Sequence, residues 1–238
     1  MIYYEHIYPT EINEQMLDAY LQKGWYRIQQ MLITTDLIAK DDGFFAVFWL
    51  RYHLPQYNHQ KKSRKLLQAI QSFTVSIEPL QITDELEELF FKYREQLDFD
   101  MSPTVKDYLQ GGKESSVFQT QLLSIRDDDK LIAAGCYDEA ADSLMGILNI
   151  YDPAYKKYSL GKVLLLLKLD EAKRLQKTYF YPGYMSLHTP KFDYKLFPAA
   201  EATEVYNRMF DKWQPYNSTN LQQLYDEMMA DFLQKQGE

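Results

Sequence analysis

Hydrophobic positions along the first third of the chain predict one helix followed by a β-hairpin. Residues 10–24 place apolar side chains three and four positions apart, which is typical of an amphipathic helix, and Thr10 is a suitable N-cap. Residues 25–34 alternate between apolar and polar, and residues 44–54 are strongly apolar. A turn at 41–43 separates these two segments, so we predict that they pair as a hairpin.

In the remainder of the chain, segments with the helical spacing of apolar residues alternate with segments that have the apolar pattern of strands. We predict helices over 83–99, 102–112, 160–176 and 222–236, strands over 73–80 and 178–186, and three strands within 117–153. Three meandering strands, then a long helix and a further strand, are typical of an α+β acyltransferase fold of the GNAT type. The apolar stripes LMGIL and VLLLLKL are expected to be core.

Composition narrows the class of protein. The chain has 238 residues with 46% hydrophobic content, which fits one large domain or two small fused domains. Its net charge of −8 argues against a broadly basic nucleic-acid binder, although a local basic patch remains possible. No apolar run reaches the length of a membrane span and the first residues do not resemble a signal peptide, so we expect a cytoplasmic protein with no membrane partner.

Candidate chemistry concentrates where the third of these strands meets the long helix, in YDPAYKKYSLGK (residues 151–162). Free N–H groups at a helix N-terminus favour anions, Gly161 permits close approach, and Lys162 adds positive charge. Ser159 could cap the helix. The segment therefore predicts either an anion-binding turn or an ordinary helix start.

The C-terminal half resembles the aminoacyl-tRNA–protein transferases, which include arginyl- and leucyl-transferring members. The matching motifs, in the family's order and spacing, are Tyr151-Asp152-Pro153, Ser159-Leu160-Gly161, Tyr181-Pro182-Gly183-Tyr184 and Lys191-Phe192-Asp193-Tyr194-Lys195. Two weaker matches lie upstream, GWYR at 24–27 and KKSRK at 61–65. The resemblance implies two fused GNAT-like halves, which we place at 1–80 and 81–238, the second ending in a helical tail.

The resemblance also implies the reaction, in which the free α-amine of an acceptor protein attacks the ester at the 3′ end of a charged tRNA. This reaction is the chemistry of protein arginylation or leucylation, which creates N-degrons. The implied partners are aminoacyl-tRNA and a protein N-terminus, and no further cofactor is implied. Arginine or leucine is the implied donor amino acid.

Site residues follow from the same match. The expected substrate-binding residues are Tyr151, Asp152, Ser159, Gly161, Lys162, Tyr181, Tyr184, Lys191 and Lys195, and the expected tRNA-binding residues are Lys61, Lys62, Arg64 and Lys65. Asp152 could bind a cationic aminoacyl group or only form a turn, and Tyr184 could stack on the terminal adenine or only pack in the core. Lys191 and Lys195 could contact backbone phosphate or be solvated charges. The general base is not identified, because none of the four histidines falls on the family's pattern.

The chain departs from the family at the metal-binding cysteines near its N-terminus. Cys136 is the only cysteine, so we expect no bound iron or zinc. Two alternatives remain open. The chain could be a GNAT-type N-acyltransferase that uses acyl-CoA, although its loop has only one glycine, or a non-catalytic binder of protein N-termini.

Overall fold

The computed structural model describes residues 4–40, 43–98, 100–187 and 194–236. Its helices are α1 (Glu14–Gln22), α2 (Lys61–Ala69), α3 (Asp84–Arg94), α4 (Val105–Gln110), α5 (Leu160–Arg174) and α6 (Leu221–Gln236). The strands of its large sheet are β6 (Phe48–His53), β7 (Thr74–Pro79), β8 (Thr120–Asp127), β9 (Lys130–Glu139), β10 (Ser143–Tyr151), β11 (Tyr179–Met185), β12 (Thr203–Asn207) and β13 (Lys212–Pro215). Short strands near the N-terminus are β1 (Tyr4–Ile7), β2 (Tyr26–Ile28), β3 (Met31–Thr35), β4 (Leu37–Lys40) and β5 (Gly43–Ala46).

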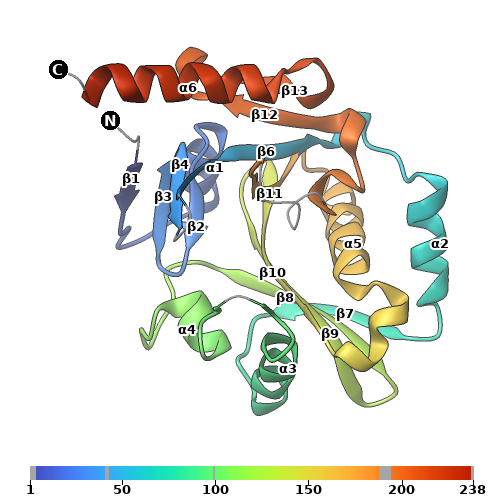
Figure 1. Ribbon diagram of the computed structural model, residues 1–238. Helices are drawn as coiled ribbons and strands as arrows, with labels where there is room; N and C mark the ends of the chain where they lie inside the picture. Colours follow the sequence, from blue (N-terminus) through green and yellow to red (C-terminus); the bar gives the residue numbers. More distant parts are fainter. Residues whose placement is uncertain (1–3, 41–42, 99, 188–193, 237–238) are drawn as a thin grey trace.

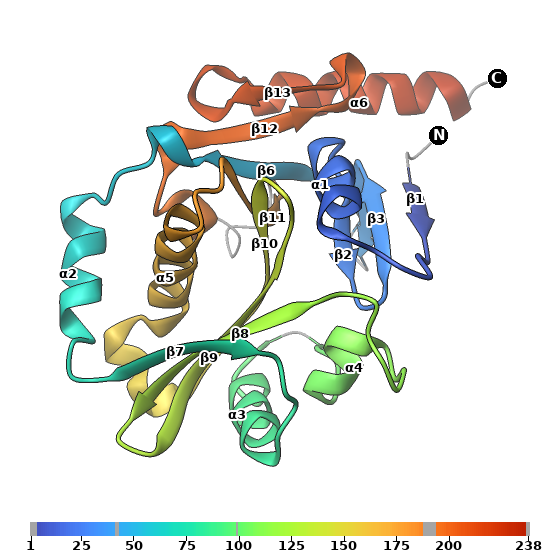
Figure 2. The same cartoon turned by 180° about the vertical axis from the view of Figure 1, so that it is seen from behind.

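One eight-stranded sheet organises the molecule, in the order β13-β12-β6-β11-β10-β9-β8-β7. Figure 1 shows α5 against this sheet with α2 outside it, while α3 and α4 lie at the opposite end from β12, β13 and α6. The reverse view in Figure 2 shows the same arrangement. Strands β7 to β10 form an antiparallel meander, and α5 then connects β10 to the parallel strand β11.

Strands β10 and β11 pair only at their beginnings. Their parallel ladder runs from Ser143 opposite Tyr179 to Met145 opposite Tyr181 and then ends, although β10 continues to Tyr151. A bulge in β10 between Gly146 and Leu148 coincides with the point where they separate. Separated strands leave backbone groups unpaired toward the gap, which is where a ligand can enter. This topology confirms the predicted α+β, GNAT-like fold class.

The prediction of a hairpin between residues 25–34 and 44–54 is wrong. Segment 25–34 folds back on itself, with β2 paired to β3 around Gln29, whose φ is +54°. The second segment divides into β5, which pairs with β4, and β6, which pairs with β11 and β12. Apolar alternation identifies strands but does not choose their partners, which tertiary packing decides.

The first helix also begins later than expected. Its N-cap is Asn13, whose side chain accepts a hydrogen bond from the Met16 N–H at 2.9 Å, so Thr10 lies outside the helix. The helix ends near Gly24 as predicted, where φ is +71° and a Cβ would meet the Tyr206 ring at 2.4 Å. Only glycine fits both constraints.

The division into halves at 80/81 stays a prediction. Strands from both predicted halves share the large sheet, because β7 pairs with β8 at one edge and β6 lies between β11 and β12. A boundary at residue 80 therefore crosses a continuous hydrogen-bonded sheet.

Candidate functional site

A cavity of about 970 Å³ opens where β10 and β11 separate. Its walls come from the β2 hairpin, the C-terminal end of α3, α4, β10, the N-terminal half of α5, and β11. Segments from both ends of the sequence thus meet around the gap in the sheet. A volume of this size is typical of small-molecule or cofactor sites.

The N-terminus of α5 forms one side of the cavity mouth. Ser159, Gly161 and Lys162 all line it. Ser159 adopts a left-handed conformation at φ +53°, and its carbonyl accepts hydrogen bonds from Lys162 N–H and Val163 N–H at 2.9 and 3.2 Å. Ser159 occupies the N-cap position, as the sequence predicted, but its hydroxyl forms no capping hydrogen bond. The N-terminus of α5 therefore lies at the cavity, where the positive end of the helix dipole favours an anion.

Aromatic side chains form much of the wall. The lining includes Tyr26, Trp49, Tyr93, Tyr108, Tyr151, Phe180, Tyr184 and Tyr194. Tyr26 stacks on Trp49 with ring centroids 5.6 Å apart, and Trp49 also meets Tyr184 edge to face at 5.6 Å. The Tyr26 hydroxyl donates to the Gly146 carbonyl in the β10 bulge, and burial holds the pKa of Tyr26 well above its usual value. Such surfaces bind an adenine ring or an apolar side chain.

Two buried lysines lie deeper in the cavity. Lys195 is 8% exposed and its Nζ donates to the Tyr184 carbonyl at 2.7 Å, in space left by the absent side chain of Gly183. Lys168 is 1% exposed and donates to the carbonyls of Cys136 and Leu148 at 2.7 and 2.8 Å. Burial lowers the pKa of each ammonium to about 7.

Six of the predicted substrate-binding residues meet in this one cavity. They are Tyr151, Ser159, Gly161, Lys162, Tyr184 and Lys195. Lys195 is buried, so it is not the solvated charge that was the alternative to a phosphate contact. Lys191 lies outside the residues that the structure describes.

Asp152 and Tyr181 lie elsewhere. Asp152 is buried beside the cavity, where it accepts from the Ala154 N–H at 2.9 Å and pairs with Lys130 at 2.7 Å. Burial raises the pKa of the Asp152 carboxyl, but these two partners outweigh it and hold the pKa below its usual value. Tyr181 packs against Trp213 with centroids 5.6 Å apart, on the other face of β11. The position of Asp152 favours the turn alternative, and Tyr181 is a core residue that does not line the cavity.

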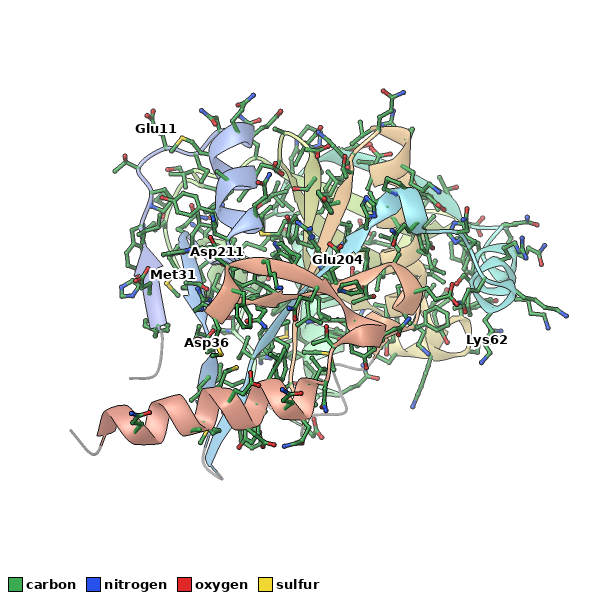
Figure 3. All side chains as sticks on the ribbon, turned by 90° about the horizontal axis from the view of Figure 1, so that it is seen from above. Glu11, Met31, Asp36, Lys62, Glu204 and Asp211 are labelled. Atoms are coloured by element: carbon green, nitrogen blue, oxygen red, sulfur yellow. The ribbon has the colours of Figure 1, made fainter. Side chains whose placement is uncertain are left out.

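The predicted tRNA-binding cations lie on α2. Lys61, Lys62, Arg64 and Lys65 are all exposed, and none of them lines the cavity. Figure 3 shows Lys62 on the outer side of the molecule, far from β12 where Glu204 lies. The cluster forms a separate positive surface on the helix that packs against α5.

Sequence patterns missed several lining residues, above all Lys168. Lys168 is the one cation in the apolar run VLLLLKL, which was predicted to be core. The run is indeed buried, and a charged residue at a buried helical position was the signal that could have identified Lys168. Trp49 and Tyr26 carried no such signal, because aromatic residues in strands are ordinary.

Arg27 of the GWYR motif joins the N-terminal hairpin to the C-terminal sheet. It is 2% exposed, pairs with Asp138 of β9 at 2.7 Å, and donates to the Leu109 carbonyl of α4 at 2.8 Å. Its neighbour Tyr26 thereby reaches the cavity. The motif positions one wall of the site.

Comparison with known proteins identifies the family. The family model "Arginine-tRNA-protein transferase, C terminus" matches residues 85–230, more than half of the chain, including α5, β10 and β11. The chain belongs to the arginine-tRNA-protein transferase family. Its members are acyltransferases, which fits a cavity placed at the separated strands.

Curated proteins similar to this chain are named as leucyltransferases. An aspartate/glutamate leucyltransferase of Leptospira interrogans is 28% identical over 199 residues, covering 79% of this chain and 74% of that protein. One of Nitrosococcus oceani is 30% identical over 161 residues, covering 66% of each. Among solved structures, L-PGS from Bacillus licheniformis aligns with a TM-score of 0.45 at 14% identity over 76% of this chain and 55% of that one.

Two further observations concern metals and membranes. Within the described ranges, no three His, Cys, Asp or Glu side chains gather in a way that could hold a metal ion. Of the helices in those same ranges, none combines the length and apolar character that a bilayer span requires. The expectation that the protein binds no iron or zinc stays a prediction.

Proposed function

We propose that the protein transfers leucine from leucyl-tRNA to the α-amine of proteins that begin with aspartate or glutamate. The observation that supports this proposal is the excess of positive charge among the residues that line the cavity. Among the lining residues that the structure describes, Asp100 is the single carboxylate and it is exposed, whereas four lysines are present: Lys156, Lys162, Lys168 and Lys195. The relatives from Leptospira interrogans and Nitrosococcus oceani are named as aspartate/glutamate leucyltransferases, which is the same specificity.

An arginyl side chain fits this cavity poorly. A guanidinium group binds best to a carboxylate pair, and the one acidic lining residue is at the solvent-exposed edge. A leucyl side chain, by contrast, suits walls made of Tyr26, Trp49, Tyr108 and Leu148. The lysines can bind the acidic side chain of the acceptor, and Lys195 is the more exposed of the two buried ones.

The reaction forms one bond between heavy atoms, breaks another, and moves one proton. The acceptor nitrogen attacks the ester carbonyl, the C–N bond forms, and the bond from the carbonyl carbon to the ribose oxygen breaks. The amine loses a proton and the ribose oxygen gains one. We propose that the cavity acts mainly by placing amine and ester together, because an aminoacyl ester is already activated. Since charged tRNA is consumed, we also place the reaction in the cytoplasm.

The test pairs a panel of donors with a panel of acceptors. Leucyl-, phenylalanyl- and arginyl-tRNA are each incubated with peptides beginning with Asp, Glu, Asn, Gln, Lys or Arg, and mass spectrometry measures the added residue. We expect leucine on Asp and Glu peptides. Addition of arginine instead of leucine would show that leucyl-tRNA is not the donor. Acetylation from acetyl-CoA without any transfer from tRNA would show that the proposed reaction is wrong.

A further inference from the structure

Lys168 and Asn149 meet at the deep end of the cavity, above Gly135. A Cβ built on Gly135 would lie 2.8 Å from Lys168 Cε, 3.2 Å from Lys168 Nζ and 3.0 Å from Asn149 Oδ1. Both side chains line the cavity. Gly135 therefore leaves the space in which an ammonium group and an amide oxygen lie side by side.

Both side chains of this pair keep hydrogen-bonding groups that no described residue uses. Lys168 uses two of its three N–H donors on the Cys136 and Leu148 carbonyls. Asn149 Oδ1 is buried and has no hydrogen-bond partner among the described residues. A buried acceptor without a partner costs free energy, so a ligand that donates to it would bind favourably. A ligand group that satisfies both residues must accept one hydrogen bond and donate one, as a hydroxyl does.

The distance of the pair from the α5 N-terminus indicates that the hydroxyl belongs to the ribose of a bound nucleotide. Lys168 follows Gly161 by seven residues on α5, a rise of about 10 Å. Helical side chains lean toward the N-terminus, which shortens the distance from the Lys168 ammonium to the helix start. A nucleotide whose phosphate is held at the α5 N-terminus would thus place its ribose within reach of the pair.

We propose that Lys168 and Asn149 bind the ribose 2′-hydroxyl beside the aminoacyl ester of the donor tRNA. The hydroxyl accepts from the Lys168 ammonium and donates to Asn149 Oδ1. This inference rests on the proposed function, because it takes aminoacyl-tRNA as the donor. Fixing the ribose fixes the ester next to it, so the pair would orient the carbonyl for attack by the acceptor amine.

The test compares a natural 3′ end with one that lacks this hydroxyl. Leucine is linked through a stable amide to tRNA ending in 3′-amino-3′-deoxyadenosine, which keeps the 2′-hydroxyl, or in 3′-amino-2′,3′-dideoxyadenosine, which lacks it, and binding is measured at equilibrium, so that ester reactivity plays no part. The proteins compared are the wild type, Lys168→Met, Asn149→Ala and Gly135→Ala. The last should displace the Lys168 ammonium without removing its charge. Lys173→Met, an exposed lysine on the same helix, is the matched control.

The wild type and Lys173→Met should bind the deoxy end about tenfold more weakly, the loss of a typical buried hydrogen bond. The three site variants should bind the natural end about tenfold more weakly than the wild type does, and they should no longer distinguish the two ends. Asn149→Ala should fold normally, because Asn149 Oδ1 has no protein partner in the described structure, so it decides the question if Lys168→Met proves unstable.

Equal binding of the two ends by the wild type would overturn the inference, and so would a tenfold preference that survives in Asn149→Ala and Gly135→Ala. The proposed function is tested separately. Binding of the amide-linked donor without transfer from leucyl-tRNA to any peptide would contradict the function and leave the binding comparison intact.

Discussion

The molecule carries positive charge in two contrasting regions, the buried lysines of the cavity and the exposed cations of α2. Lys168 and Lys195 lie 27 positions apart in the sequence, are 1% and 8% exposed, and each donates to main-chain carbonyls. The α2 cluster, Lys61, Lys62, Arg64 and Lys65, is contiguous in sequence and fully at the surface. The α2 cluster can be identified from the sequence alone, whereas the sequence does not show that Lys168 and Lys195 share a cavity.

The contrast shows that removal from water does more than clustering in the sequence to strengthen the interaction of a charged side chain with its partner. An exposed cation is screened by water and salt, so it contributes weak, long-range attraction. A buried ammonium interacts in a low-dielectric surrounding and binds a specific partner strongly. We therefore expect the cavity lysines to determine chemistry and selectivity, and the α2 cluster to contribute only general affinity for tRNA.

The largest effect should come from Lys195→Met, which keeps the side-chain volume and removes the charge. Transfer to peptides beginning with Asp or Glu should fall about a hundredfold in kcat/KM, as expected for loss of a buried charged hydrogen bond. Transfer to peptides beginning with Asn or Gln should change less. Lys65→Met serves as the control for removal of one lysine. An unchanged ratio of acidic to amide peptides would show that Lys195 does not recognise the acceptor.

Gly161→Trp should have the next largest effect, because it fills the mouth of the cavity at the α5 N-terminus. We expect kcat/KM for leucyl-tRNA to drop about thirtyfold, or about 2 kcal/mol, with a smaller change in affinity for the body of the tRNA. Gly161→Ala is the matched control. Its Cβ would lie 3.5 Å from the Tyr151 ring, an ordinary contact, so it should retain activity. Full activity in Gly161→Trp would show that the substrate does not approach this helix end.

Replacing all four α2 cations with glutamine should affect binding rather than chemistry. Affinity for tRNA should fall about tenfold at low salt, and the log–log salt slope should lose about two units if two or three phosphate contacts are real. Folding stability should barely change. Glutamine at Lys92, Lys113, Lys173 and Lys212, which are also exposed, controls for the change in net charge. An identical slope in the α2 variant would leave α2 as a solvated surface.

The smallest effect concerns pH and stability. The pKa of Lys168 falls from 10.5 to about 7 on folding, so between these pH values the unfolded chain holds more protons. Stability should therefore rise with pH above 7, by at most about 1.4 kcal/mol per unit from this lysine. Urea unfolding of the wild type and Lys168→Met at pH 7, 8 and 9 measures the difference. Parallel curves would show that Lys168 keeps its proton in the folded state.

Local patterns predicted the second half of the fold well. Strands β7 to β11 and helices α3 to α6 lie close to their expected ranges, and the Thr83 side chain caps α3, accepting from the Leu86 N–H at 3.3 Å. These elements follow one another along the chain, so short-range signals are sufficient. The N-terminal strands were harder, because β6 pairs with β11 and β12, which follow it by more than a hundred residues.

By itself, the sequence determined the helix and strand periodicities, the Ser-Leu-Gly helix start and the family motifs that gather around it. Tertiary structure decided which of those residues share a cavity. It assigned Asp152 to an ion pair with Lys130, packed Tyr181 against Trp213, and brought Lys168 to the floor of the site. The physical reason is that burial and pairing depend on contacts between distant segments. A lysine in an apolar run can only be interpreted once the strand carbonyls that hold its ammonium are known.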